Sequence, residues 1–196
     1  MSAVLAFERL DRRVLAAFSF VDPLGRRVAA SVSVTAVEPG VRLMRKRPGE
    51  YVVMATPGLG DHVTAFDAPP ATPAIGSAPV TLDIRPADRA LGPRRYLLKL
   101  PRDPDPEGAR LPDSLFQPAM IPLPAGTGAG PSGLAAAVRV TVARADDNRL
   151  VEGALVRVRT AGKPEAWGLT DAAGEALVLV PGVPLASPGP GATVVW

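Results

Sequence analysis

The chain has 196 residues, of which 47% are hydrophobic, a composition that allows one or two domains with apolar cores and excludes a disordered chain. Its 23 prolines and 19 glycines disfavour a helical fold, because proline breaks helix interiors and glycine weakens them. The net charge of +3 arises from 22 basic and 19 acidic residues that are mostly dispersed, so we expect no nucleic-acid partner.

Cysteine is absent, which favours a reducing compartment. The first residues include Glu8 and Arg9, and no apolar stretch is long enough for a signal peptide or a membrane span. We therefore expect a cytoplasmic protein, or one assembled in the cytoplasm, without a membrane span. Release of an assembled particle, or action at a surface, is left open.

Alternation of apolar and polar residues predicts short strands through the first hundred residues. Proline and glycine mark the turns between them, as in Asp22-Pro23-Leu24-Gly25 and Glu38-Pro39-Gly40. About seven strands in this length are typical of a β-sandwich. They are predicted at 14–21, 28–36, 41–45, 51–55, 62–66, 80–85 and 95–100.

A stretch rich in proline and glycine follows, from 101 to 133, which excludes a central strand or a stable helix. It predicts a linker at 103–134 between a domain at 1–102 and a second at 135–196. Within the linker, residues 111–123 are too apolar for a solvated spacer, and we expect them to dock on a neighbouring domain or subunit. The side chains predicted to do so are Leu115, Phe116, Met120 and Ile121, while 126–133 would be flexible.

The second domain shows the same kind of alternation. Strands are predicted at 138–142, 154–158, 167–169 and 175–180, with a last one at 193–196. About sixty residues is small for an independent core. We therefore expect this domain to rely on the first domain, or on another protein, for its stability.

One pattern occurs twice. Thr170 to Glu175 leads into an apolar strand closed by Pro181-Gly182, and Arg45 to Glu50 leads into one followed by Pro57-Gly58. A repeated unit of this kind indicates two related β-sandwich domains. The first copy carries a basic cluster, Arg42, Arg45, Lys46 and Arg47, in place of the second copy's Thr-Asp turn, and we predict that this cluster contacts a partner.

The second domain resembles the carboxypeptidase regulatory-like (transthyretin-like, Cna-B-like) β-sandwich. The resemblance rests on about forty-five residues that follow the family's order of strand, turn, Gly-Ala-x-Val strand, Thr-Asp-x-x-Gly turn and apolar strand. They are the strand 138–142, the turn 146–149, Glu152 to Val156, Leu169 to Glu175, Leu177 to Leu179 and Pro181-Gly182. The first domain is a divergent relative. Some Cna-B members form a Lys–Asn isopeptide bond, but Asn148, the sole asparagine, lies in a turn, so none is expected.

No catalytic or metal constellation is apparent. His62 is the only histidine, and we interpret it as a residue of a surface turn. Asp146, Asp147 and Asp171 could converge on a hard cation, but turn capping is the simpler interpretation. We expect neither enzymatic activity nor a cofactor.

Together these features predict an all-β protein of two immunoglobulin-like or transthyretin-like β-sandwich domains joined by a Pro/Gly-rich linker. Where the resembled family occurs without a secretion signal or an attached enzyme, one setting is the contractile phage-tail-like injection system. The resemblance thus implies a structural or adaptor subunit whose partners are other protein subunits, with homo-oligomerisation left open. The alternative is a carbohydrate- or cell-surface-binding module that uses Trp167 or Trp196.

Overall fold

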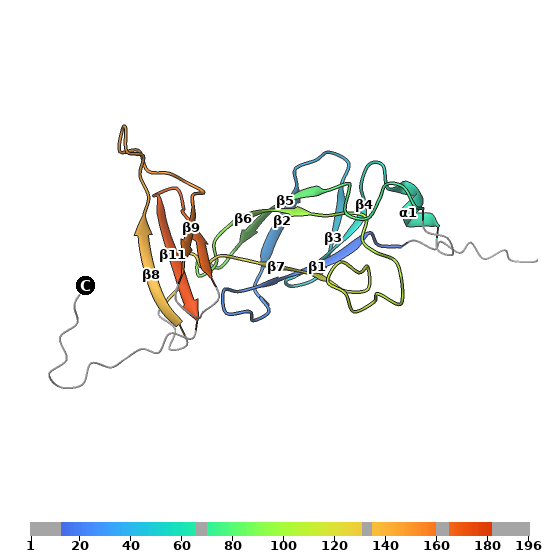
Figure 1. Cartoon of the computed structure of the whole chain (residues 1–196), viewed down its shortest axis with the longest axis horizontal. Helices are drawn as coiled ribbons and strands as arrows, with labels where there is room; N and C mark the ends of the chain where they lie inside the picture. The colour runs from blue at the N-terminus through green and yellow to red at the C-terminus, as the bar shows by residue number, and fades with distance from the viewer. Residues whose placement is uncertain (1–12, 66–69, 131–134, 160–164, 182–196) are drawn as a thin grey trace, which may run out of the picture. The chain divides into compact units, whose positions relative to one another are not determined.

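The computed structural model describes residues 13–65, 70–130, 135–159 and 165–181 (Figure 1). In these residues the regular secondary structure is almost entirely β, as predicted, with eleven strands and one short helix. The strands are β1 (Ala16–Val21), β2 (Val32–Ala36), β3 (Arg42–Arg47), β4 (Glu50–Ala55), β5 (Val80–Pro86), β6 (Arg94–Leu98), β7 (Ala119–Pro122), β8 (Ala135–Thr141), β9 (Leu155–Val158), β10 (Ala166–Leu169) and β11 (Glu175–Pro181). The strand predicted at 193–196 lies outside the described residues.

The described residues form two compact units, each drawn from separated segments of the chain. The first comprises residues up to Ser19 with Val34–Asp83 and Arg95–Met120. The second comprises Phe20–Ser33, Ile84–Arg94 and residues from Ile121 onward. No helix in the described part of the chain is long and apolar enough to cross a bilayer.

Strands β1 to β7 form two sheets, ordered β3-β4-β1-β7 and β2-β5-β6. Strand β1 is buried on both faces, since its consecutive residues Phe18, Ser19 and Phe20 are all buried. β1 runs antiparallel to β4, and the rings of Phe18 and Tyr51 stack with centroids 5.6 Å apart. Such a stacked pair adds to the free energy gained by burying the two rings.

The predicted strand at 62–66 is wrong. Residues Gly60–Thr64 form the helix α1 instead, beside β4 in the first unit (Figure 1). The Ala65 N–H donates to the carbonyl of Asp61, the i to i+4 bond of a helical turn, so local hydrogen bonding outweighs a short alternation of side chains. His62 is also not on the surface, as it is only 8% exposed.

The predicted linker contains a strand, β7. It lies at the edge of its sheet, where proline is tolerated, and the Leu123 N–H donates to the carbonyl of Val21 at 2.8 Å. The following residues, predicted to be flexible, are hydrogen-bonded where the structure describes them. The N–H groups of Gly126 and Gly128 donate to the carbonyls of Ala90 and Arg89.

In the second unit, β11 pairs with β8 and lies against the β9–β10 pair. Its Val178 and Val180 pack with Ala166 and with side chains of β8 and β9. Its Leu177 and Leu179 point the other way and pack with a group from outside these strands, namely Leu24, Ala125 and Ala129. Both faces of β11 are therefore covered, which explains a continuous apolar run where a half-exposed strand would alternate.

The two copies of the repeated pattern differ in structure. Arg47 pairs with Glu50 across a tight turn between β3 and β4 of one sheet. The Thr170–Glu175 copy instead connects β10 to β11, which belong to different sheets. The two copies therefore occupy different positions in their sheets.

Candidate functional site

The four basic residues predicted to contact a partner lie together on β3, an edge strand of its sheet. All four side chains are exposed, and only Leu43 turns inward. Arg47 forms an ion pair of 2.6 Å with Glu50, and its pKa is raised by that hydrogen bond. Among the described residues, Arg42, Arg45 and Lys46 form no ion pair, so β3 presents three cationic side chains to solvent.

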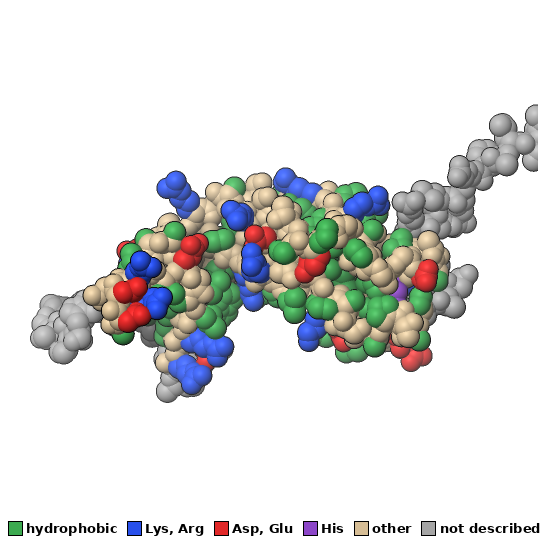
Figure 2. Space-filling view, turned by 90° about the horizontal axis from the view of Figure 1, so that it is seen from above, with side chains coloured by type: hydrophobic (Ala, Val, Ile, Leu, Met, Phe, Trp, Pro, Cys, Tyr) green, Lys and Arg blue, Asp and Glu red, His purple; other side chains and the backbone are tan. Residues whose placement is uncertain are grey.

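Charge elsewhere on the protein is mixed. Figure 2 shows Lys and Arg side chains spread over the face in view and interspersed with Asp and Glu. Several of these form exposed pairs, such as Arg26 with Asp22 and Arg159 with Glu165. The run of unpaired cations on β3 is therefore a local feature of one strand, separate from the small net charge of the chain.

The predicted apolar contact residues lie at the opposite edge of the same sheet, on β7 and the loop before it. Phe116 is 54% exposed and Met120 is 41% exposed, Leu115 is half-buried, and Ile121 is fully buried in the core. Met120 also accepts a hydrogen bond from the Ser19 hydroxyl at 3.1 Å. The structure thus places the basic and apolar groups on opposite edges, and Ile121 has no exposed surface to offer a partner.

Arg102 fixes the loop that carries Phe116. Its Nε donates to the Ser114 carbonyl at 3.0 Å, and its Nη2 donates to the carbonyls of Gln117 and Pro112. Only 8% of Arg102 is exposed, and this burial lowers the pKa of its guanidinium, which the charge of Asp113 partly offsets. A buried charge that binds three backbone carbonyls holds this proline-rich loop in one conformation.

A cavity of about 760 Å³ lies next to Arg102 in the first unit. Prolines and alanines form half of its lining, and Ile75 and Phe116 contribute large apolar side chains. The polar residues of the lining are Arg13, His62, Arg102, Asp103 and Asp105. The Nε2 atom of His62 lies 3.2 Å from the Thr72 carbonyl oxygen. No sequence pattern predicts this cavity, because the residues that line it come from separate segments of the chain and five of the 14 are prolines.

The three aspartates considered as cation ligands are each engaged locally. Asp146 pairs with Arg144 at 2.8 Å, and that hydrogen bond lowers the pKa of Asp146. Asp147 accepts the Arg149 N–H, and Asp171 accepts N–H groups of its own turn. In the described ranges, no three Asp, Glu or His side chains are grouped closely enough to hold a metal ion.

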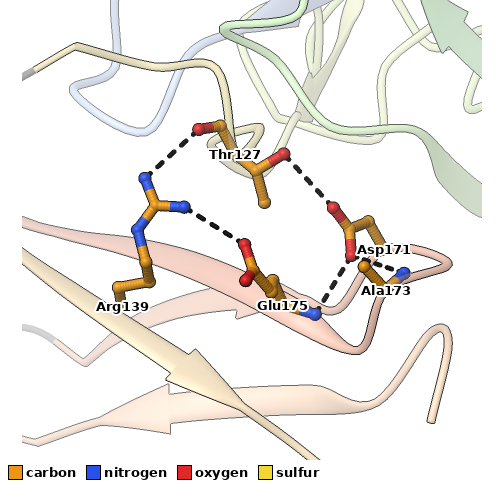
Figure 3. A network of polar contacts seen from close by, with 5 residues as sticks. All are labelled: Thr127, Arg139, Asp171, Ala173 and Glu175. Atoms are coloured by element: carbon orange, nitrogen blue, oxygen red, sulfur yellow. Dashed lines mark hydrogen bonds and ion pairs between the residues drawn. The ribbon is translucent and has the colours of Figure 1, made fainter. Parts of the chain in front are cut away.

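A polar network surrounds Asp171 in the second unit (Figure 3). The Thr127 hydroxyl donates to Asp171 Oδ2 at 3.2 Å. Arg139 of β8 forms an ion pair with Glu175 at 3.2 Å and also donates to the Thr127 carbonyl. These contacts join the loop at Thr127 to the turn that precedes β11, and they line a second cavity of about 570 Å³. Since the side chains of Arg139 and Glu175 are 53% and 40% exposed, solvent screens their ion pair.

Trp167, the described member of the predicted sugar platform, lies on β10 and is half-buried. The guanidinium of Arg94 covers one face of its indole at 4.7 Å from the ring centroid. This cation–π contact leaves that face unavailable for stacking on a sugar. Trp196 lies outside the described residues.

Comparison with known proteins returned no match to a protein-family profile, to a curated protein or to a solved structure. We therefore infer the function of the chain from its own surfaces.

Proposed function

We propose that this protein is a non-enzymatic structural or adaptor subunit of a large protein assembly, and that the assembly is a contractile phage-tail-like injection particle. In the proposal the chain has two β-sandwich domains, within 1–102 and 135–196, and the proline- and glycine-rich stretch at 103–134 contributes β7 to a sheet of strands from the first hundred residues. It joins the particle in the cytoplasm by binding other protein subunits. The resemblance of the second domain to the carboxypeptidase regulatory-like sandwich supports the choice of assembly.

The observation that carries the proposal is the exposure of β3. An edge strand leaves one row of backbone N–H and C=O groups without a strand partner, which allows another chain to add to the sheet. β3 surrounds that row with Arg42, Arg45 and Lys46, all exposed. Charged side chains also protect edges against unwanted pairing, and they then select partners whose surface carries the opposite charge. We therefore propose an acidic surface of another subunit as the partner of β3.

A charge-reversal experiment tests this assignment. The variant Arg42→Glu/Arg45→Glu/Lys46→Glu should fail to co-sediment with assembled particles from the native host, because like charges now face each other at the interface. A control, Lys99→Glu/Arg110→Glu/Arg149→Glu, changes the net charge equally through three other exposed residues and should remain with the particles. Sedimentation of the wild-type chain as a free monomer, with none in the particle fraction, would contradict the proposal.

A further inference from the structure

The cavity beside α1 combines apolar walls with an exposed apolar mouth. Five prolines line it, at positions 70, 73, 101, 104 and 106, and its volume of about 760 Å³ is within the range of sites that hold a ligand or a short peptide segment. At the mouth, Ile75 is 53% exposed and Phe116 is 54% exposed. Two large apolar side chains next to an apolar hollow would lose contact with water if another apolar side chain entered it.

Two arginines line this cavity, Arg13 and Arg102, and Arg102 is held in a defined position. Arg102 is 8% exposed and uses Nε and Nη2 on backbone carbonyls, while its Nη1 forms no hydrogen bond to any described residue. His62 is equally buried, and its Nε2 lies 3.2 Å from the Thr72 carbonyl oxygen. Its Nδ1 forms no hydrogen bond to any described residue. A guanidinium that is fixed and largely desolvated binds a carboxylate more strongly than a solvated one does.

The acidic residues of the lining, Asp103 and Asp105, do not occupy the guanidinium of Arg102 as ion-pair partners. Asp103 Oδ1 accepts the N–H of Asp105 at 3.0 Å, and Asp105 Oδ1 accepts the N–H of Glu107 at 2.9 Å. Neither forms an ion pair with Arg102 in the part of the chain that the structure describes. Asp105 is exposed, so solvent screens its charge, whereas Arg102 is buried and screened less.

We propose that this cavity binds an extended segment of a partner protein, which inserts one large apolar side chain between Ile75 and Phe116 and places a neighbouring carboxylate on Nη1 of Arg102. The proposal rests on the proposed function in one respect, because it takes the occupant from a protein subunit of the assembly. It concerns a different surface from the basic strand β3, and it can therefore be tested separately.

The test uses the full chain, labelled with ¹⁵N, and two peptides, Ac-Ala-Phe-Glu-Ala-NH₂ and its glutamine counterpart. The glutamate peptide should shift the backbone resonances of Ala74, Ile75 and Phe116 with a dissociation constant on the order of 1 mM. The glutamine peptide should bind about tenfold more weakly, because it lacks the charge that pairs with Arg102.

Substitutions at the mouth of the cavity test its apolar part and leave the buried Arg102 unchanged. Ile75→Asp and Phe116→Asp change exposed side chains, and each should abolish the shifts. Leu155→Asp changes a residue of β9 that is 50% exposed and should leave binding unchanged.

Three results would overturn the proposal. The first is the absence of shifts at about 10 mM peptide, a concentration about ten times the expected dissociation constant. The second is equal affinity for the two peptides, and the third is binding of phenylacetate as tight as that of the glutamate peptide. The last result would indicate a small-molecule site. The β3 triple variant should bind the glutamate peptide normally. A loss of particle association together with intact peptide binding would therefore separate the two proposals.

Discussion

At the scale of single residues, Asp22 and Asp171 build two turns of the same form. In each turn the aspartate Oδ1 accepts the N–H groups two and four residues ahead, at 2.9 to 3.0 Å. The glycine three residues ahead, Gly25 or Gly174, has a positive φ and donates its N–H to the aspartate carbonyl. The aspartate therefore satisfies backbone donors that the tight turn leaves without strand partners.

Replacing Asp171 should destabilise the protein measurably. Asp171→Ala removes acceptors for two N–H groups and for the Thr127 hydroxyl, so the free energy of unfolding should fall by about 1–3 kcal/mol. Asp171→Asn keeps one side-chain oxygen as an acceptor and should lower the free energy of unfolding by less. Urea titration followed by circular dichroism measures both. Glu152→Ala, at an exposed residue with no hydrogen bond among the described residues, is the control, and an equal loss there would contradict the assignment.

Turns of this form can be predicted from the sequence alone. Asp-x-x-Gly spacing predicts a local turn, because the aspartate, the glycine and the N–H groups lie within five residues. The role of Arg102 could not be predicted in this way, since its carbonyl partners at Pro112, Ser114 and Gln117 lie ten or more residues away. In the sequence it is one of many arginines, and only the folded loop distinguishes it.

At the scale of elements, Glu38 connects the end of β2 to β5. Its Oε2 accepts the backbone N–H of Thr81 at 2.8 Å, beside a backbone bond from the Val37 N–H to the Thr81 carbonyl. Hydrogen bonding from the Thr81 side chain, helped by the backbone N–H, lowers the pKa of Glu38, and burial opposes this effect. Glu38 therefore binds its proton less readily in the folded chain than in the unfolded one.

This difference predicts a pH-dependent contribution to stability. Because the folded-state pKa is the lower one, the contribution is present above the ordinary glutamate value of about 4.3 and is lost as the pH falls through the folded-state pKa. Glu38→Gln should lower the free energy of unfolding at about pH 7, and the difference from wild type should shrink toward about pH 2. Thermal melts across that range measure it, and a difference independent of pH would exclude the linkage.

Elements whose own apolar residues decide their structure were predicted best. β5 and β11 fall within a residue of their predicted positions because each has a long apolar pattern. The helix α1 and the edge strand β7 could not be predicted in this way. In α1 helical backbone hydrogen bonding outweighs a five-residue pattern, and β7 depends on pairing with β1, about a hundred residues away.

At the scale of the whole molecule, the second unit is assembled from segments that the sequence keeps apart. Leu24, Ala125 and Ala129 pack on the outer leucines of β11, and Arg139 of β8 bonds to the Thr127 carbonyl. Residues from before position 135 therefore complete the packing around β11 in this unit. Such contacts could not be predicted from local pattern, because they involve single small residues in a proline- and glycine-rich stretch.

A pair of glycine substitutions tests whether this stretch is packed. A Cβ on Gly126 would lie 2.2 Å from the Arg89 carbonyl oxygen, whereas a Cβ on Gly130 would meet nothing within 4 Å. Gly126→Ala should therefore lower the free energy of unfolding by about 1–3 kcal/mol through steric overlap, and it should speed hydrogen exchange at Gly128 and Ala129. Gly130→Ala should be neutral, or stabilising by up to about 1 kcal/mol, because it only restricts the unfolded chain. Equal effects of the two changes would mean that residues 126–130 are a solvated linker in solution, and that β11 is covered on one face alone.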